Sequence, residues 1–138
     1  MARTKFHVEV LTPEGEVFND DVEMIATKTV GGSIGILAHH QPLLAMLDPA
    51  ELRLYRSESE TVRFAQGEGY LQVAGDGSVL ILVEDAHDPT TLDTAELAEQ
   101  LRAAEDAFAK ADSHSEEQRV AARDKRRLEA FQRIAEGG

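Results

Sequence analysis

Three short segments of this sequence contain residue types that could carry out chemistry. The adjacent histidines His39 and His40 could offer imidazole nitrogens to a metal ion. The glycine-rich segment 31–35 could wrap around a phosphate, and the carboxylates of Glu84 and Asp85 could act as an acid/base pair. Each of these chemistries requires a particular spacing of the residues that take part.

The spacing around these segments favours structural roles over catalysis. Adjacent side chains of an extended chain point to opposite sides, and no third ligand stands near His39 and His40 at a useful spacing. Segment 31–35 lacks both the Gly-x-Gly-x-x-Gly pattern and the Lys-Ser/Thr pair of a phosphate-binding loop, so we interpret it as a turn. Glu84 and Asp85 are expected to end a strand. We expect no catalytic residue, no metal site and no cofactor.

Charge and composition exclude several classes of partner. The 138-residue chain has 26 acidic and 14 basic residues and a formal net charge of −12, which repels nucleic acid and anionic lipid. It has no cysteine, and no apolar run approaches the ~20 residues of a membrane-spanning helix. The first residues lead directly into strand-like sequence without a targeting segment. We therefore expect a cytoplasmic protein with no nucleic-acid partner and no direct membrane span.

The first half of the chain has the pattern of an antiparallel β-sandwich. Phe6, Val8 and Val10 alternate with polar residues, which is the two-residue period of a half-buried strand. Short apolar stretches of this kind recur at intervals of about 8–12 residues, separated by turn-forming residues. The continuous apolar run 79–83 predicts a strand that is buried on both faces.

The second half has the pattern of two helices. From Leu92 onward there is no proline, and glycine returns only at the last two positions. Asp93 and Ser115 each have the character of a helix N-cap, and segment 112–114 interrupts the helical pattern between them. So short a connection predicts an antiparallel hairpin. We therefore predict an α+β chain, with a β-sandwich anchoring domain over residues 1–87 and a helical hairpin regulatory domain over residues 88–138.

The second predicted helix concentrates basic side chains on one face. At 100° per residue, five arginines lie together next to the apolar face; this basic ridge consists of Arg119, Arg123, Arg126, Arg127 and Arg133. The ridge either is a solvated face that pairs with acids of the first helix or binds an acidic protein surface. Asp124 falls within the apolar face, where burial of an unpaired carboxylate is costly, so we expect a marginally stable, movable hairpin.

Segment 32–44, which reads Gly-Ser-Ile-Gly-Ile-Leu-Ala-His-His-Gln-Pro-Leu-Leu, resembles the signature of a known family. That signature, Gly-x-x-Gly-Ile-x-Pro-x-His-x-Pro-Leu, belongs to the epsilon subunit of F-type ATP synthase. Segment 6–18 resembles the opening hairpin of the family, and segments 69–73 and 79–86 resemble its last sandwich strands. Asp93 stands where the family begins its helical hairpin. The resemblance covers essentially the whole chain in the right order.

The resemblance implies a non-catalytic rotor subunit in the central stalk of a bacterial, proton-translocating ATP synthase. The β-sandwich would bind the gamma subunit and rest on the c-ring, at the cytoplasmic face of the cell membrane. The expected interface with the c-ring and gamma consists of Gly32, Gly35, His39, His40 and Pro42. The hairpin would extend toward the catalytic α/β subunits and inhibit ATP hydrolysis, with the basic ridge meeting their acidic surface.

The sequence departs from the family pattern at two positions. Ala38 takes the place of the usual proline in the glycine-rich loop. Some bacterial members bind ATP at the start of the hairpin through an Ile/Leu-Asp-x-x-Arg-Ala motif, and Glu96 stands in place of its arginine here. Because a carboxylate repels phosphate, we expect weak or no ATP binding.

Two alternatives stay open beside this resemblance. A stand-alone β-sandwich that binds a small ligand would be active as a monomer and would give the basic ridge no role. A small enzyme on a cupin-like barrel would need metal ligands that the sequence lacks.

Overall fold

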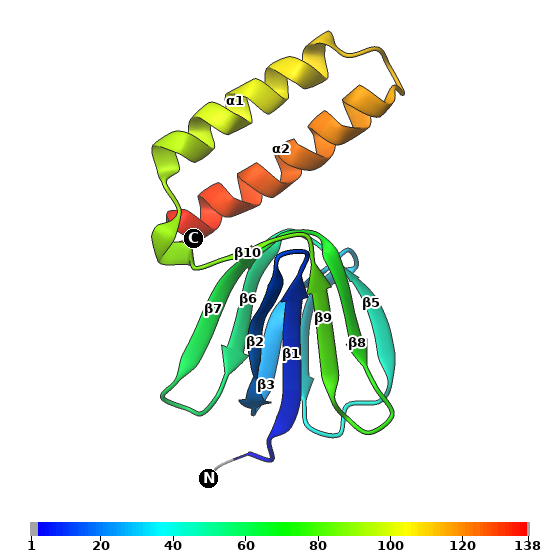
Figure 1. Ribbon diagram of the computed structural model, residues 1–138, viewed down its shortest axis with the longest axis vertical. Helices are drawn as coiled ribbons and strands as arrows, with labels where there is room; N and C mark the ends of the chain where they lie inside the picture. The colour runs from blue at the N-terminus through cyan, green and yellow to red at the C-terminus, as the bar shows by residue number, and fades with distance from the viewer. Residues whose placement is uncertain (1–2, 138) are drawn as a thin grey trace. The chain divides into compact units, whose positions relative to one another are not determined.

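The computed structural model describes residues 3–137 of the chain. It forms two compact units, Met1–Asp88 and Pro89–Gly138, the first built of strands and the second of helices (Figure 1). This arrangement confirms the predicted fold class, a β-sandwich followed by two helices.

Within the described residues, the first unit contains ten strands in two layers (Figure 1). We call the layer β10-β7-β6-β3-β4 sheet I and the layer β5-β8-β9-β1-β2 sheet II. The two layers join where β3 pairs with β5, at Thr29 and Leu47. The strand bounds are β1 Phe6–Thr12, β2 Gly15–Val22, β3 Met24–Thr29, β4 Gly32–Leu37, β5 Leu43–Leu47, β6 Ala50–Tyr55, β7 Thr61–Gln66, β8 Gly69–Val73, β9 Val79–Val83 and β10 Ala86–His87.

Strand pairing is antiparallel apart from one pair. Strands β1 and β9 run parallel, with Val8 beside Val79 and Val10 beside Ile81. Since parallel neighbours cannot be joined by a tight hairpin, this pair brings together segments far apart in the sequence. The pairing joins β1 and β2 to the other three strands of sheet II.

The hydrophobic core lies between the two sheets. The alternation predicted for the first strand is confirmed, because Phe6, Val8 and Val10 are all buried. Side chains of both sheets complete the core without accessible surface; among them are Ile25, Ile36, Leu52, Leu54, Leu71 and Ile81. Burial of apolar area contributes roughly 25 cal/mol per Å² to folding, so this core is the main stabilising element of the sandwich.

The prediction that segment 79–83 is buried on both faces is wrong. Val79, Ile81 and Val83 are buried, whereas Leu82 is exposed. Each sheet of a two-layer sandwich has one face against the core and one face open, so alternate residues of β9 reach the surface even though they are apolar.

The second unit is an antiparallel helical hairpin (Figure 1). A short 3₁₀ turn, η1 (Pro89–Thr91), precedes α1 (Thr94–Lys110), and α2 (Glu116–Ala135) follows the interrupting segment. Both predicted N-caps are confirmed: Asp93 accepts hydrogen bonds from two amides of the first turn of α1, and Ser115 accepts one from α2. These contacts satisfy backbone donors that a helix start otherwise leaves unpaired.

Asp124 is less buried than its place on the apolar face of α2 suggests. Its side chain is 36% exposed, and Oδ1 lies 3.7 Å from the guanidinium of Arg127. Both residues line a groove between the helices together with alanines of α1. The carboxylate is therefore neither fully buried nor unpaired, and the marginal stability of the hairpin stays a prediction.

A glycine in β8 is required by a close backbone contact. A Cβ atom at Gly69 would lie 1.9 Å from the carbonyl oxygen of Leu82. Because that neighbour is backbone, β8 and β9 would have to separate to admit a side chain. We expect Gly69→Ala to lower the free energy of unfolding by about 3 kcal/mol in urea denaturation. Gly75→Ala is the matched control, since a Cβ there meets nothing within 4 Å; equal losses at both positions would contradict this account.

Candidate functional site

Large apolar side chains are exposed on the outer face of sheet II. Leu44 and Met46 of β5 are 69% and 54% exposed, Tyr70 of β8 is 50% exposed and Leu82 of β9 is 44% exposed. The strand register places Met46 opposite Tyr70 and Tyr70 opposite Leu82, so they form a row across three strands. We call these four residues the apolar patch. Contiguous apolar surface of this kind is typical of a protein–protein contact.

A shallow groove of about 380 Å³ adjoins the apolar patch. Tyr70 and Leu82 form part of its wall, together with Leu11 at the end of β1. Glu68 and Glu84 also line it. This part of the sheet therefore offers a partner an apolar contact with an acidic rim.

Sequence reasoning missed the apolar patch, although a signal for it was present. Segments 43–47 and 79–83 both carry apolar residues on both faces of the strand. In an antiparallel sandwich, one face of each sheet is open to solvent, so two such strands in one sheet indicate an apolar outer face. For segment 79–83 the pattern instead led to the prediction of burial on both faces, and segment 43–47 carried no prediction of exposure.

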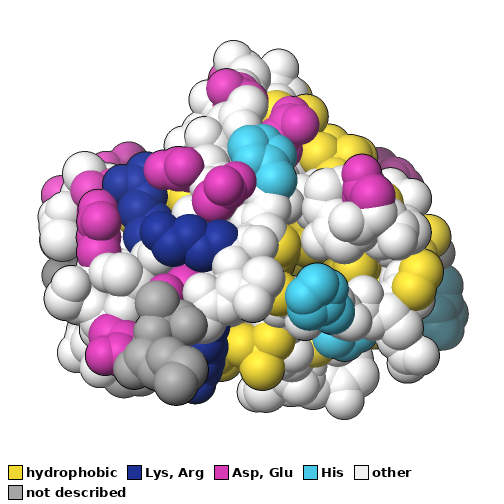
Figure 2. Space-filling view, turned by 90° about the horizontal axis from the view of Figure 1, so that it is seen from below, with side chains coloured by type: hydrophobic (Ala, Val, Ile, Leu, Met, Phe, Trp, Pro, Cys, Tyr) yellow, Lys and Arg dark blue, Asp and Glu magenta, His cyan; other side chains and the backbone are white. Residues whose placement is uncertain are grey.

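The predicted c-ring and gamma interface does not converge on one point. Gly32 begins β4 at its turn with β3, with φ of 126°, and Gly35 lies in the middle of β4. His39, His40 and Pro42 follow the other end of β4, so roughly 20 Å of strand separates them from Gly32. Figure 2 looks onto the end of the sandwich that contains the β4–β5 loop and shows histidine side chains beside exposed hydrophobic surface.

The β4–β5 loop itself has an unusual backbone. His39 has φ of 64°, in the left-handed region that non-glycine residues rarely adopt. The next imidazole is fixed locally, because Nδ1 of His40 donates a hydrogen bond of 2.7 Å to the carbonyl oxygen of Gln41. Among residues 3–137, no group of three His, Asp or Glu side chains is arranged to hold a metal ion.

Segment 31–35 also has the Gly-x-Ser-x-Gly spacing of a hydrolase nucleophile elbow, which sequence reasoning overlooked. That motif works only when its serine sits on a sharp turn from a strand into a helix. Ser33 lies within β4, paired with Lys28 of β3 in an antiparallel hairpin. The local structure therefore gives Ser33 the place of an ordinary strand residue.

The start of the hairpin presents carboxylates in place of phosphate-binding donors. Asp93 accepts hydrogen bonds from the amides of Ala95 and Glu96, at 2.9 and 3.2 Å. The carboxylate of Glu96 accepts a bond from Gln100 of the next turn. Neither carboxylate can donate a hydrogen bond to a phosphate while it is ionised.

The basic ridge lies largely on the exposed side of α2. Arg119, Arg123, Arg126 and Arg133 are exposed, and Arg127 is half-buried. Neither α1 nor α2 has the length and apolar character needed to cross a membrane. Four of the five arginines of the ridge therefore reach solvent on α2.

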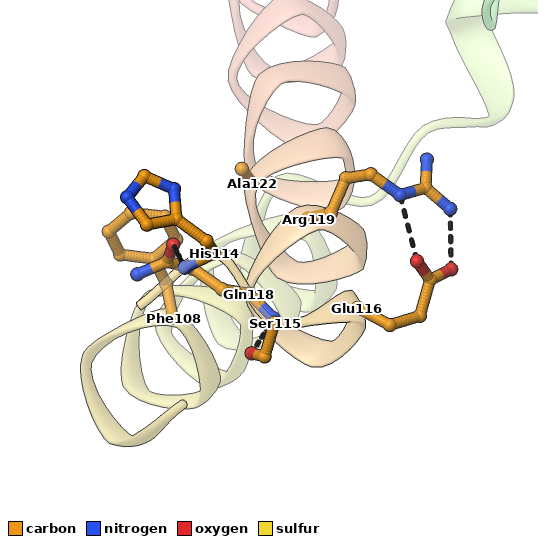
Figure 3. A pocket seen from close by; sticks show the side chains of 7 residues that line it. All are labelled: Phe108, His114, Ser115, Glu116, Gln118, Arg119 and Ala122. Atoms are coloured by element: carbon orange, nitrogen blue, oxygen red, sulfur yellow. Dashed lines mark hydrogen bonds and ion pairs between the residues drawn. The ribbon is translucent and has the colours of Figure 1, made fainter. Parts of the chain in front are cut away.

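Arg119 and Arg127 of the ridge pair with acids of α2 itself. Arg119 Nε lies 3.0 Å from Glu116 Oε2, and a second nitrogen of the same guanidinium bonds the other carboxylate oxygen (Figure 3). Arg127 pairs with Asp124 and lies over the ring of Phe131, 6.0 Å from its centre. Exposed pairs of this kind contribute only ~0.2–1 kcal/mol, so a stronger acidic partner can displace them.

A histidine on β1 is coupled to an acid of β2. Nδ1 of His7 lies 3.0 Å from Oδ1 of Asp21, and the hydrogen bond to this carboxylate raises the pKa of His7 above its ordinary value of 6.5. A raised pKa means that the pair stabilises the fold below pH 6.5 and that this contribution is lost as the pH rises through the folded pKa. In an NMR titration we expect Asp21→Asn to lower the pKa of His7. An unchanged value would contradict the coupling.

Comparison with known proteins identifies relatives of both units. The family model for the β-sandwich domain of the ATP synthase delta/epsilon chain matches residues 5–89. The ATP synthase epsilon chain of Mycolicibacterium vanbaalenii is 37% identical over 128 residues, which cover 92% of this chain and 95% of the relative. The epsilon chains of Halalkalibacterium halodurans and Persephonella marina are each 40% identical, over 63% and 64% of this chain. In both cases the match spans 64% of the relative's length.

Solved structures show the same fold. A chain of the Euglena gracilis mitochondrial ATP synthase, from a structure of OSCP, F1 and c-ring, matches with a TM-score of 0.80 at 19% identity, over 93% of this chain and 79% of that one. A chain of the Tetrahymena thermophila mitochondrial ATP synthase, from a structure of the central stalk and c-ring, matches with a TM-score of 0.65 at 24% identity. That match covers 98% of this chain and 99% of the other.

Proposed function

The chain belongs to the ATP synthase delta/epsilon family, and from this premise we propose that it is a non-catalytic subunit of the central stalk of an F-type ATP synthase. In this proposal the sandwich binds the gamma subunit and contacts the c-ring. The helical hairpin restrains ATP hydrolysis by the catalytic α/β subunits. The protein acts at the cytoplasmic face of the bacterial cell membrane, held there through the complex.

The apolar patch carries this proposal. Leu44, Met46, Tyr70 and Leu82 are exposed on one face of a sheet, although burial would be more favourable for each of them. A permanent partner subunit would remove this surface from water and recover that free energy. We assign the apolar patch to gamma because torque has to pass through a broad contact on a stiff scaffold.

The β4–β5 loop is our candidate contact with the c-ring. His39 holds a left-handed backbone conformation, which costs of order 1 kcal/mol and is common at binding sites. His40 and Pro42 lie in the same loop, and Gly35 lies in the adjoining strand. Gly32, at the far end of β4, is the member of the predicted set that this assignment leaves outside the contact.

The basic ridge is our candidate contact with the catalytic subunits. Its exposed guanidinium groups match an acidic surface, and complementary charge favours both the rate and the specificity of binding. ATP does not control the hairpin in this proposal, because Glu96 occupies the position of the motif arginine. Contacts with gamma supply the free-energy difference between hairpin positions instead.

A binding measurement tests the proposed function. Catalytic complex that contains gamma but lacks this subunit should bind the full chain with a dissociation constant in the nanomolar range, whereas complex without gamma should not bind. Titration of ATP into the isolated chain is expected to give no saturable heat. Absence of binding to the gamma-containing complex would refute the proposed function, and tight ATP binding would refute the proposed mode of control.

A further inference from the structure

We propose that sheet II binds a partner surface made of an apolar strip that is flanked by lysine and arginine side chains. This inference rests on the proposed function, in which that surface belongs to the gamma subunit, and adds its chemistry. It follows from the order of side chains across the outer face of sheet II, which changes from apolar at β5 to acidic at β2.

The register of the five strands defines this order. One row runs from Met46 through Tyr70, Leu82 and Leu11 to Glu16. The neighbouring row contains Leu44, Gln72, Leu80, Glu9 and Asn19. Each row therefore starts with an exposed apolar side chain and reaches a carboxylate on β1 or β2. We call Glu9, Glu16 and Asp21 the acidic flank.

The acidic flank is not neutralised by lysine or arginine from its own sheet. Strands β1, β2, β5, β8 and β9 contain no lysine and no arginine. Among the described residues, the imidazole of His7 pairs with Asp21 on the flank, and Lys5 precedes β1 by one residue. Asp20 of β2 is engaged elsewhere, 3.2 Å from Arg56.

Sheet I shows the contrasting arrangement. On β6 and β7, Glu51 forms ion pairs with both Arg53 and Arg63. This carboxylate already has cationic partners within the sandwich, so it has little to offer a basic surface. The acids of sheet II and the glutamates beside the groove, Glu68 and Glu84, leave an unbalanced negative field around the apolar patch.

The acidic flank determines which surface can cover the apolar patch. An acidic surface would be repelled, and a wholly apolar one would bury carboxylates without partners, which is costly. A partner surface with an apolar strip and cations at its border would cover the apolar patch and also pair with the acidic flank. Since flank charges remain at the rim of such a contact, they act mainly on the association rate and on its dependence on salt.

The test is the association rate of the full chain with gamma-containing catalytic complex at several salt concentrations. Glu9→Gln/Asp21→Asn should reduce the rate constant by roughly 3- to 10-fold at low salt and flatten its salt dependence, with little change in the dissociation rate. Glu58→Gln/Glu60→Gln removes two acids from the β6–β7 turn and is the matched control, expected to leave both quantities unchanged.

The outcomes separate this inference from the proposed function. If the flank variant binds with the rate and salt dependence of the unaltered chain, the basic partner is wrong while docking on gamma stands. Equal slowing by the control would also overturn the inference, because only net charge would then matter. If the unaltered chain does not bind, the proposed function fails and this inference fails with it. Thermal denaturation of both variants verifies that the fold is retained.

Discussion

Leu82→Asp should abolish stable docking of the chain on the gamma-containing catalytic complex. Leu82 lies at the β9 end of the apolar patch and is exposed, so the substitution leaves the core of the sandwich intact. Against gamma, however, a carboxylate would enter an apolar contact without a partner, at a cost of about 3 kcal/mol or more. We expect the dissociation constant to rise by about 100-fold, measured by surface plasmon resonance with the full chain.

Leu37→Asp is the matched control for this substitution. Leu37 has nearly the same exposure, 47% against 44%, but lies at the end of β4 in sheet I. On soluble catalytic complex that lacks the c-ring, its substitution should leave the affinity within about twofold of the unaltered chain. If Leu37→Asp weakens binding and Leu82→Asp does not, gamma binds at β4 and the assignment of the apolar patch is wrong.

Reversal of two charges on the basic ridge should release the inhibition of ATP hydrolysis. Arg123 and Arg133 are exposed on α2, and glutamate at both positions would turn attraction to an acidic catalytic surface into repulsion. We expect hydrolysis by complex reconstituted with Arg123→Glu/Arg133→Glu to be about 3- to 10-fold faster than with the unaltered chain. Binding to gamma should stay unchanged, because the substitutions leave the sandwich intact.

The control for the ridge variant carries the same change in charge elsewhere on the hairpin. Lys125 projects from a different side of α2, and Arg102 is exposed on α1. Lys125→Glu/Arg102→Glu should therefore retain inhibition. Equal release of hydrolysis by both variants would show that net charge, and not the ridge, determines the inhibition.

Much of the fold could be predicted from local sequence patterns, and the structure confirms these predictions. The alternation of Phe6, Val8 and Val10 predicted a strand with one buried face, and the caps at Asp93 and Ser115 predicted where the two helices begin. Such signals are local, because a period of two or a capping side chain acts within a few residues. Pairing of β1 with β9 joins strands that are far apart in the sequence, so no local turn signal predicts it.

The candidate site was harder to predict, because exposure depends on neighbours distant in sequence. Leu82 lies in an apolar run that fits burial on both faces, and only the position of β9 in sheet II leaves its side chain open. Arg119 was assigned to the basic ridge from its helical angle, but its pairing with Glu116 depends on side-chain geometry. The residues around Ser33 have the Gly-x-Ser-x-Gly spacing of a catalytic motif, but Ser33 lies within β4 and not at a turn from a strand into a helix.

A cross-linking measurement tests the central claim, that this chain docks on gamma through the outer face of sheet II. Because the chain has no cysteine, Leu82→Cys introduces a unique thiol for a photoreactive cross-linker. The labelled full chain is returned to ATP synthase from the same source, illuminated, and its cross-linked partner is identified by mass spectrometry. We predict a cross-link to gamma from position 82. Cross-linking of that position to the c-ring or the α/β subunits, without gamma, would contradict the account.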